Sequence, residues 1–391
     1  MQLFEQPEIR DIIEKYIGLD PVKLALKLKL PREEREAVCE QIKMLQRAAD
    51  KLPEHYKARC WLPQRAFEQS TSEAVAAAKF SEKGRLAFDL TCGLGVDTMA
   101  LARNFEQVVS VAADSELADV VEHNLKLLSI DNVVIVRSTA EEFIANWSGA
   151  NPDLIYLDPD RRDGDGKKVV VFDDCSPNVN ALMPKMLELC PKVIVKCSPL
   201  FDVDEAFRLF GDRAEVEVVS YRGECKEVLI SVCRDGASRD KLLSAVVVDR
   251  NQVSRFATSV RKANTQHSSW TGVYKYLFAP DVALCRAKLI GSIFGANSYI
   301  VSENGYVFAD EIPEQYSGYI YEIESIHPYK VRNISAMLKA EDVSRATLLQ
   351  RDFDKSNSEI ASELRIKEGG SRLLAFTTVQ GQRIVIFCEK I

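Results

Sequence analysis

The sequence contains no apolar run long enough to span a membrane. None approaches the roughly 18 residues that a transmembrane helix needs. The first residues, Met1 to Glu8, have neither the basic stretch nor the apolar stretch of a secretory signal. We therefore expect a soluble, cytoplasmic protein with no membrane partner.

The ten cysteines show none of the spacings that are typical of metal or disulfide sites. No C-x-x-C pair occurs and no pair of histidines lies nearby, so we expect reduced, buried thiols and no metal. The chain also lacks a basic excess, because 51 Lys and Arg stand against 58 Asp and Glu, for a net charge of −7. A nucleic-acid partner is therefore not favoured by overall charge.

The length of 391 residues is enough for two or three domains. Residues 1–80 are predicted to be helical, since apolar positions such as Ile12, Ile13 and Tyr16 recur at helical spacing. Short apolar runs then alternate with amphipathic segments, at 86–90, 108–112, 133–136, 153–157 and 192–196. This alternation predicts a mainly parallel sheet with helices on both faces.

Two further apolar runs, 214–221 and 226–234, are separated by only four residues. A gap that short permits a hairpin and forbids a helical crossover, so the sheet should end in an antiparallel pair. An open parallel sheet that ends in such a hairpin is typical of class I methyltransferases. We therefore predict a Rossmann-like α/β core of seven strands.

The first strand of this core runs into a turn with two glycines. The candidate binding residues there are Asp89, Thr91, Gly93, Gly95, Asp97 and Thr98. Glycines let the backbone approach a ligand, and the following helix N-terminus aims N–H groups at it. Thr98 replaces the third glycine of a dinucleotide fingerprint, and no G-K-[ST] phosphate loop occurs. The Asp89 carboxylate suits the ammonium of a methionine moiety; the alternative is a tight turn without a ligand.

Several motifs together resemble a family of class I methyltransferases with a C-terminal THUMP-like domain. They are EQSTSE (68–73), DLTCGLGVDT (89–98), LDPDRRD (157–163), KCSPL (196–200), GECKE (223–227) and LRIKEGG (364–370). The resemblance implies S-adenosyl-L-methionine as the cofactor. It implies a structured RNA, such as tRNA or rRNA, as a partner, because THUMP domains bind RNA.

The resemblance also implies a division of the chain into four regions. They are a helical N-terminal region (1–80), a methyltransferase core (81–238), a linker with a small ferredoxin-like domain (239–321), and a THUMP-like domain with α+β structure (322–391). In such enzymes the segment before the first strand folds over the cofactor, which assigns Gln69, Ser70 and Thr71 to its carboxylate end. Alternatively, Thr71 or Ser72 caps the helix that begins at Glu73.

The adenosine side departs from the family pattern. Ala112 stands where an acid normally holds the ribose hydroxyls, and a lost charged hydrogen bond of about 1.5–3 kcal/mol would weaken cofactor binding tenfold or more. Asp114, or less readily Glu116, could reach the ribose instead, although Asp114 could equally cap a helix. Thr139 and Ala140 are the candidates on the adenine side.

The strand at 153–157 delivers four catalytic candidates to its C-terminal end, where open α/β sheets bind ligands: Asp158, Pro159, Asp160 and Arg161. Enzymes that methylate exocyclic amines have a similar segment, with an Asp or Asn, two prolines and an aromatic residue. Here Asp160 and Arg161 replace the second proline and the aromatic residue, so this motif supplies no stacking for a base. Asp158 and the Pro159 carbonyl would accept the two N–H bonds and direct the nitrogen lone pair at the methyl group. Arg161 or Arg162 could grip a phosphate or a base edge. The alternative is an acidic turn tied to its own arginines.

Lys196 and the cluster at 224–227 lie at neighbouring strand ends, where we expect ion pairs. A catalytic cysteine at Cys197 or Cys225 is disfavoured because no histidine is paired with either.

Three functions remain open from the sequence. The first is an RNA methyltransferase, the second a non-catalytic RNA-binding scaffold with a degenerate cofactor site, and the third a methyltransferase that acts on a small molecule or a protein. Basic residues near the C-terminus are the candidate phosphate contacts, or else a solvated charged face: Arg345, Arg351, Arg365, Lys367 and Arg372.

Overall fold

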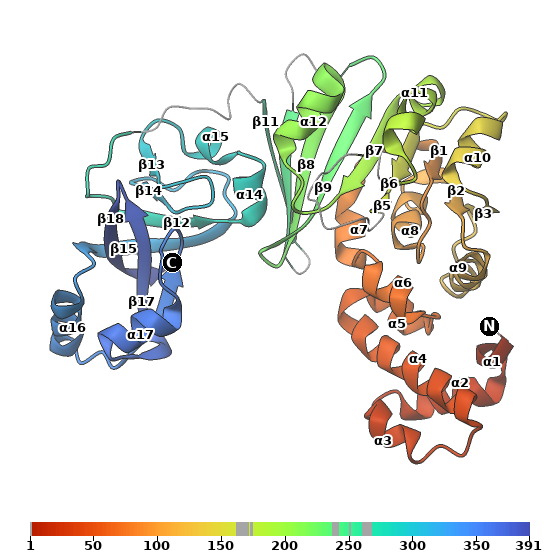
Figure 1. Ribbon diagram of the computed structural model, residues 1–391, viewed down its shortest axis with the longest axis horizontal. Helices are drawn as coiled ribbons and strands as arrows, with labels where there is room; N and C mark the ends of the chain where they lie inside the picture. The colour runs from red at the N-terminus through yellow and green to blue at the C-terminus, as the bar shows by residue number, and fades with distance from the viewer. Residues whose placement is uncertain (1, 162–171, 173–174, 237–241, 250–251, 260–267) are drawn as a thin grey trace. The chain divides into compact units, whose positions relative to one another are not determined.

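The computed structural model describes residues 2–161, 172, 175–236, 242–249, 252–259 and 268–391. The chain forms two compact units (Figure 1). The first unit comprises Met1–Phe201 and Leu229–Gly236, and the second comprises Asp202–Val228 and Ala237–Ile391. The domain boundary predicted at 238–239 lies outside the described residues.

The first unit begins with helices that pack on one another. They are α1 (Gln2–Glu5), α2 (Pro7–Tyr16), α3 (Pro21–Ala25), α4 (Arg32–Lys51), α5 (Pro53–Ala58), α6 (Gln64–Gln69) and α7 (Glu73–Lys79). Helix α4 buries Val38, Ile42 and Leu45, whose spacing of three and four residues puts them on one face. In Figure 1, α2 and α3 lie along α4 at the end of this unit.

Two buried amides fasten these helices to the core. The Gln41 side chain of α4 donates to the Cys60 carbonyl at 2.8 Å and accepts from the Leu62 amide at 3.2 Å. The Asn124 side chain of α9 (Ser115–Leu127) exchanges two hydrogen bonds, of 2.8 and 2.9 Å, with the Trp61 backbone. Because both amides find donors and acceptors inside the protein, they hold the segment that leads into α6 in one place.

The sheet of the first unit is parallel from β7 to β3. Its strands are β7 (Lys192–Cys197), β4 (Leu154–Leu157), β1 (Gly84–Asp89), β2 (Phe105–Ala112) and β3 (Val133–Arg137), in that spatial order. All four residues of β4 are buried, as expected for a strand covered on both faces. Helices α8 (Val96–Ala102), α9, α10 (Ala140–Asn146) and α11 (Val179–Leu189) connect the strands. The predicted Rossmann-like architecture is confirmed.

Strand β9 (Glu224–Cys233) runs through both units. In the first unit it lies next to β7, and in the second it lies next to β8 (Ala214–Tyr221). Arg222 and Gly223 join β8 to β9 with φ values of 52° and 78°, the two positive values that a type I′ hairpin turn requires. The predicted terminal hairpin is therefore present.

Two strands beyond the hairpin were not expected in this sheet. In the second unit, β10 (Leu242–Asp249) pairs parallel with β8, and β11 (Gln252–Ser259) pairs antiparallel with β10. Helix α12 (Val203–Phe210) and the 3-10 turn η2 (Gly211–Arg213) precede β8. The sheet thus extends beyond the predicted seven strands.

The second unit contains a separate seven-stranded sheet. Its spatial order is β13 (Ser298–Ile300), β14 (Val307–Ala309), β12 (Tyr276–Pro280), β15 (Gly318–Pro328), β18 (Gln382–Lys390), β17 (Lys367–Val379) and β16 (Arg345–Gln350). Besides α12, the described part of this unit contains α14 (Val282–Arg286), α15 (Ile290–Phe294), α16 (Val331–Ala340) and α17 (Asn357–Leu364). The boundary predicted at 321–322 lies inside β15.

Both faces of this second sheet carry apolar cores. On one face Phe376 and Phe387 pack with Ile334 of α16 and Ile360 of α17. On the other face Ala375 and neighbouring residues pack with Tyr306 and Phe308. Alternate residues of β17 thus enter opposite cores, as the two-residue period of a strand dictates.

Candidate active site

The glycine turn after β1 is built on a buried carboxylate. Gly93 and Gly95 have φ values of 51° and 82°, and a Cβ on Gly95 would lie 2.9 Å from Val121. Asp89 accepts hydrogen bonds from the Thr91 amide at 3.0 Å and from the Thr98 hydroxyl at 2.6 Å. Burial raises the pKa of Asp89 to about 6. Asp89 is fully buried, so it supports the turn from below.

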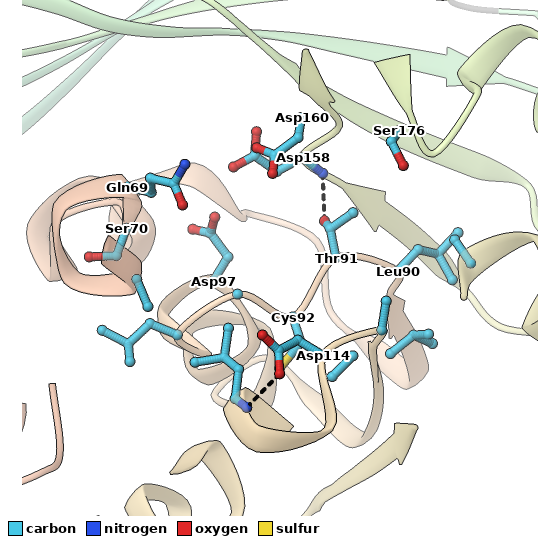
Figure 2. A pocket seen from close by; sticks show the side chains of 18 of the residues that line it. Gln69, Ser70, Leu90, Thr91, Cys92, Asp97, Asp114, Asp158, Asp160 and Ser176 are labelled. Carbon is cyan, nitrogen blue, oxygen red and sulfur yellow. Dashed lines mark hydrogen bonds between the residues drawn. The ribbon is translucent and has the colours of Figure 1, made fainter. Parts of the chain in front are cut away.

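A cavity of about 650 Å³ lies above this turn (Figure 2). Nine of the predicted cofactor residues line it: Gln69, Ser70, Thr71, Thr91, Gly93, Asp97, Asp114, Thr139 and Ala140. The predicted residues Asp89, Gly95 and Thr98 lie in the turn without lining the cavity. Figure 2 shows Asp158 and Asp160 together at one side of the cavity, with the Gln69 amide facing Asp97. The Ser70 hydroxyl points away from Asp97 and donates to the Phe67 carbonyl at 2.9 Å.

Asp97, in the first turn of α8, is held by three donors. Its carboxylate accepts from Lys79 at 2.8 Å, from the Tyr156 hydroxyl at 2.7 Å and from the Thr71 hydroxyl at 3.3 Å. Burial opposes ionisation of Asp97, but the Lys79 and Lys196 cations outweigh it and hold its pKa below the usual value. Asp97 is therefore a carboxylate in the cavity wall, only 12% exposed.

Asp158 follows β4 directly and is fixed at both its backbone and its side chain. Its amide donates to the Thr91 hydroxyl at 2.7 Å, and its carboxylate pairs with Lys196. Burial raises the pKa of Asp158, and Lys196 works against that rise. The expected ion pair of Lys196 is thus present, and its partner is the leading catalytic candidate.

The other catalytic candidates predicted after β4 differ in whether they line the cavity. Asp160 lines the cavity and belongs to β5 (Asp160–Arg161), which pairs with β6 (Cys175–Ser176). Pro159 does not line the cavity. The backbone of Arg161 pairs with that of Cys175, which joins β5 to β6. Arg162 lies outside the described residues. Ser176 and Pro177, which no sequence motif indicated, also line this side.

Asp114 lies at the opposite side and caps α9. One of its oxygens accepts from the amides of Glu116 and Leu117 at 2.9 and 3.1 Å, while the residue also lines the cavity. Ala112, Glu116 and Glu141 line the cavity as well, and Thr139 caps α10 through a hydrogen bond from the Glu142 amide at 3.2 Å. Capping and cavity lining therefore coexist at Asp114 and Thr139. Glu141 was missed because it lies within a helix, without a motif of its own.

Three cysteines near the strand ends are poor candidates for a nucleophile, because burial raises the pKa of the thiol or because the residue does not line the cavity. Cys92 lines the cavity, where burial raises its pKa to about 12. Burial also raises the pKa of Cys225. Cys197 is 8% exposed and does not line the cavity.

The five basic residues near the C-terminus fall into two groups. Arg351 donates to backbone carbonyls, among them that of Pro280 at 2.8 Å, and Arg372 pairs with Glu324 and Glu341. Both serve the internal structure of the second unit. The side chains of Arg345, Arg365 and Lys367 are exposed.

Comparisons with known proteins agree with this architecture. Residues 63–152 match the family described as tRNA (uracil-5-)-methyltransferase, and residues 318–390 match the family described as THUMP domain-like. An uncharacterised S-adenosylmethionine-dependent methyltransferase of Mycobacterium tuberculosis is 25% identical over 317 residues, which cover 79% of this chain and 82% of that protein. A tRNA/tmRNA (uracil-C(5))-methyltransferase of Shewanella woodyi is 27% identical over 136 residues, covering 29% of this chain and 37% of that protein.

A solved structure extends the similarity to the whole chain. The crystal structure of a candidate methyltransferase from Porphyromonas gingivalis W83 superposes with a TM-score of 0.82 at 25% identity, covering 98% of this chain and 97% of that one. Among the described residues, no helix is both long and apolar enough to cross a bilayer. The chain is a class I S-adenosylmethionine-dependent methyltransferase with a THUMP-like C-terminal domain.

Proposed function

We propose that this methyltransferase transfers its methyl group to RNA, with Asp158 at the acceptor site. The observation that carries the proposal is the presence, in one chain, of a cofactor-sized cavity bordered by Asp158 and of a THUMP-like region at 318–390. The first supplies the chemistry and the second an RNA-binding element. An acceptor amine of an RNA base is the substrate group that suits Asp158 best.

The cavity fits the cofactor in size and in donor set. Its volume of about 650 Å³ falls within the roughly 300–1,000 Å³ of small-molecule sites. Asp97 is an ionised carboxylate that can accept the ammonium of the methionine moiety, beside Thr71 and the Gly93 backbone. Asp114 keeps one oxygen available for the ribose hydroxyls, because the other oxygen makes both capping bonds.

On the acceptor side, Asp158 would orient the nucleophile. When bound, S-adenosylmethionine would supply the methyl group, with its sulfonium sulfur as the leaving group. The Asp158 carboxylate accepts an N–H of the incoming amine, which turns its lone pair toward the methyl group. The amine proton then passes to that carboxylate or to water. Asp160 and Ser176 form the adjoining wall.

RNA would be held through phosphates by the exposed basic residues of the second unit. Arg345 and Lys367 are register partners on β16 and β17, and Arg365 ends α17 two residues before Lys367. Such contacts position a nucleic acid without reading its sequence. Arg351 and Arg372 are not proposed for this role, because their guanidinium groups are engaged internally.

A second candidate reaction is methylation of a pyrimidine carbon. The match to the tRNA (uracil-5-)-methyltransferase family favours it, but that match ends at residue 152, before Asp158 and Cys197. Carbon methylation of a pyrimidine needs a thiolate to add to the neighbouring ring carbon. Cys197, which follows Lys196 at the end of β7, is a candidate for this thiol, but it does not line the cavity. An amine acceptor therefore remains our first proposal.

The test combines a deletion strain with the purified protein. Nucleosides from total RNA of the deletion strain should lack one methylated species in mass spectrometry, and the protein with labelled S-adenosylmethionine should restore it. Loss of an N-methylated nucleoside supports the amine proposal, and loss of a C5-methylated pyrimidine supports the second candidate. An unchanged RNA profile, with label entering protein or small molecules, would overturn both.

A further inference from the structure

A single lysine links the two sides of the cavity. Lys196, in β7, donates to the Asp158 carboxylate and also to the Thr71 hydroxyl at 3.3 Å. A threonine hydroxyl carries one proton, and Thr71 donates it to Asp97 at 3.3 Å. The lone pairs of Thr71 are thereby left for Lys196. The hydrogen bonds run in one direction, from Lys196 through Thr71 to Asp97.

The charged groups around Asp158 determine how far the ionisation of its carboxyl group depends on Lys196. Burial raises the pKa of Asp158 and the Asp97 carboxylate adds to the rise, while the Lys196 and Lys79 cations lower it. Asp160 lies beside Asp158 in the cavity wall, and the buried Asp89 is near enough that Asp158 adds to the rise of the Asp89 pKa. The Lys196 side chain is 15% exposed and that of Asp158 is 38% exposed, so water screens their attraction only in part. Lys196 therefore stabilises the ionised form of Asp158 and holds its carboxylate in one orientation.

We propose that Lys196 is a positioning residue, which aims the Asp158 carboxylate at the acceptor and couples it through Thr71 to the Asp97 side of the cofactor site. The acceptor half of this inference rests on the proposed function, whereas the Thr71 link concerns the cofactor alone. Displacement at either end of the chain of hydrogen bonds disturbs the other end. Occupancy of the cofactor site thus helps to set the Asp158 carboxylate for the acceptor.

A lysine with a merely structural role would behave differently. Its removal would lower thermal stability and leave the kinetics of the surviving folded protein unchanged. The structure offers a matched control on the same strand, because Lys192 at the opposite end of β7 pairs with Glu82 at 2.7 Å. Lys192→Met removes the same charge and a similar ion pair, away from the cavity.

The first experiment measures methyl transfer to RNA against pH for Lys196→Met, Lys196→Arg and Lys192→Met. We expect Lys196→Met to lower kcat about tenfold or more, with the KM for RNA within about twofold, since the carboxylate orients mainly in the transition state. The acid limb of the kcat profile should move up by about one pH unit, because Asp158 has lost an adjacent cation. Lys196→Arg should restore most of kcat, and Lys192→Met should retain the wild-type profile. A wild-type kcat and acid limb in Lys196→Met would overturn the positioning role.

The second experiment needs no acceptor. Calorimetry with S-adenosylhomocysteine should show weaker binding in Lys196→Met and in Thr71→Val, by about threefold or more each. The double variant should bind no more weakly than the worse single variant, because both changes break one chain of hydrogen bonds. Additive losses, or no loss in Lys196→Met, would overturn the link. If the wild-type protein methylates no RNA, the proposed function and the acceptor half of the inference fail, and this calorimetric result still decides the link through Thr71.

Discussion

The Thr98 hydroxyl donates a 2.6 Å hydrogen bond to the Asp89 carboxylate, and both side chains are completely buried beneath the glycine turn. Thr98 also contacts the Ser110 hydroxyl at 2.9 Å. The turn that shapes the floor of the cofactor cavity therefore rests on an ionisable group with no access to water. Its protonation should be visible in the stability of the fold.

The first prediction concerns pH and Asp89. The pKa of Asp89 is raised from 3.8 to about 6 in the folded state, so the folded state holds the proton more tightly than the unfolded state. Stability from this group is present below about pH 4 and is lost as pH rises through about 6, by on the order of 2–3 kcal/mol. Asp89→Asn cannot ionise. Its unfolding free energy in urea should lack this fall between pH 4 and 6.

The control for this prediction is Asp114→Asn, which changes an exposed carboxylate near the same turn and should keep the wild-type pH dependence. Parallel curves for wild type and Asp89→Asn would mean that Asp89 stays ionised across this range. The burial argument would then be wrong.

The contrast between Asp89 and Asp97 shows how far sequence reasoning reaches at this site. Strand, glycine turn and helix are predictable because each has a local signature, and the residues of the turn converge at the carboxyl edge of a parallel sheet. Which carboxylate faces the ligand depends on side-chain direction and on partners from other elements. Lys79 of α7 and Tyr156 of β4, which hold Asp97, carry no motif that would have identified them.

The second prediction addresses the missing acid at Ala112. If Asp114 holds the ribose, Asp114→Asn should weaken S-adenosylhomocysteine binding about tenfold while keeping α9 capped, because Asn is as good a cap as Asp. Asp114→Ala should bind as weakly and also lose about 1 kcal/mol of stability from the missing cap. Calorimetry and urea unfolding separate the two effects.

Ala112→Glu tests the same question from the other side. It should tighten cofactor binding if the ribose hydroxyls lack a full set of acceptors. Wild-type affinity in Asp114→Asn, together with about tenfold gain in Ala112→Glu, would show that no acid holds the ribose in the wild-type chain.

The third prediction concerns the exposed basic residues of the second unit. Charge reversal at Arg365 and Lys367 should weaken RNA binding and lower the slope of log affinity against log salt by about one for each phosphate that the variant no longer neutralises. Lys339→Glu, an exposed change in α16 of the same unit, is the control. Gel-shift titrations at several salt concentrations measure the slope. Equal slopes for all variants would place the RNA elsewhere.

Point variants are better here than a truncation. Deletion from residue 322 onward would cut β15 within its length and remove β16, β17 and β18. The remaining strands β12, β13 and β14 would lose the sheet neighbours that cover their core. Such a protein would lose RNA binding through unfolding of the second unit, whatever surface the RNA uses.

The limits of sequence reasoning on the fold have a similar cause. The hairpin of β8 and β9 is predictable because its connection is too short for a crossover. The pairing of β10 with β8 is not, since the strands are separated in sequence by β9 and only tertiary interactions select the partner. The buried amides of Gln41 and Asn124 are likewise invisible in the sequence, where polar residues in amphipathic helices normally face water.

The last prediction separates chemistry from binding at Asp158. Asp158→Asn keeps the size of the side chain and can still contact Lys196 through its carbonyl oxygen, but it loses the negative charge. Because a preorganised acceptor acts on the transition state, kcat should fall by about 100-fold or more, as when other electrostatic interactions of this kind are removed. The Kd for RNA and for S-adenosylhomocysteine should stay within about twofold, since neither requires the carboxylate charge in the ground state.

Two measurements decide this prediction: a labelled-methyl transfer assay under single-turnover conditions, and paired binding titrations on the same preparation. Asp160→Asn is the matched control, because Asp160 lines the same wall without taking part in the hydrogen bonds that join Lys196 to Thr71 and Asp158. It should retain most of the transfer rate. If Asp158→Asn transfers methyl groups at the wild-type rate while Asp160→Asn does not, the orienting carboxylate is Asp160. In that case Lys196 stabilises the turn after β4, and the acceptor is oriented from β5.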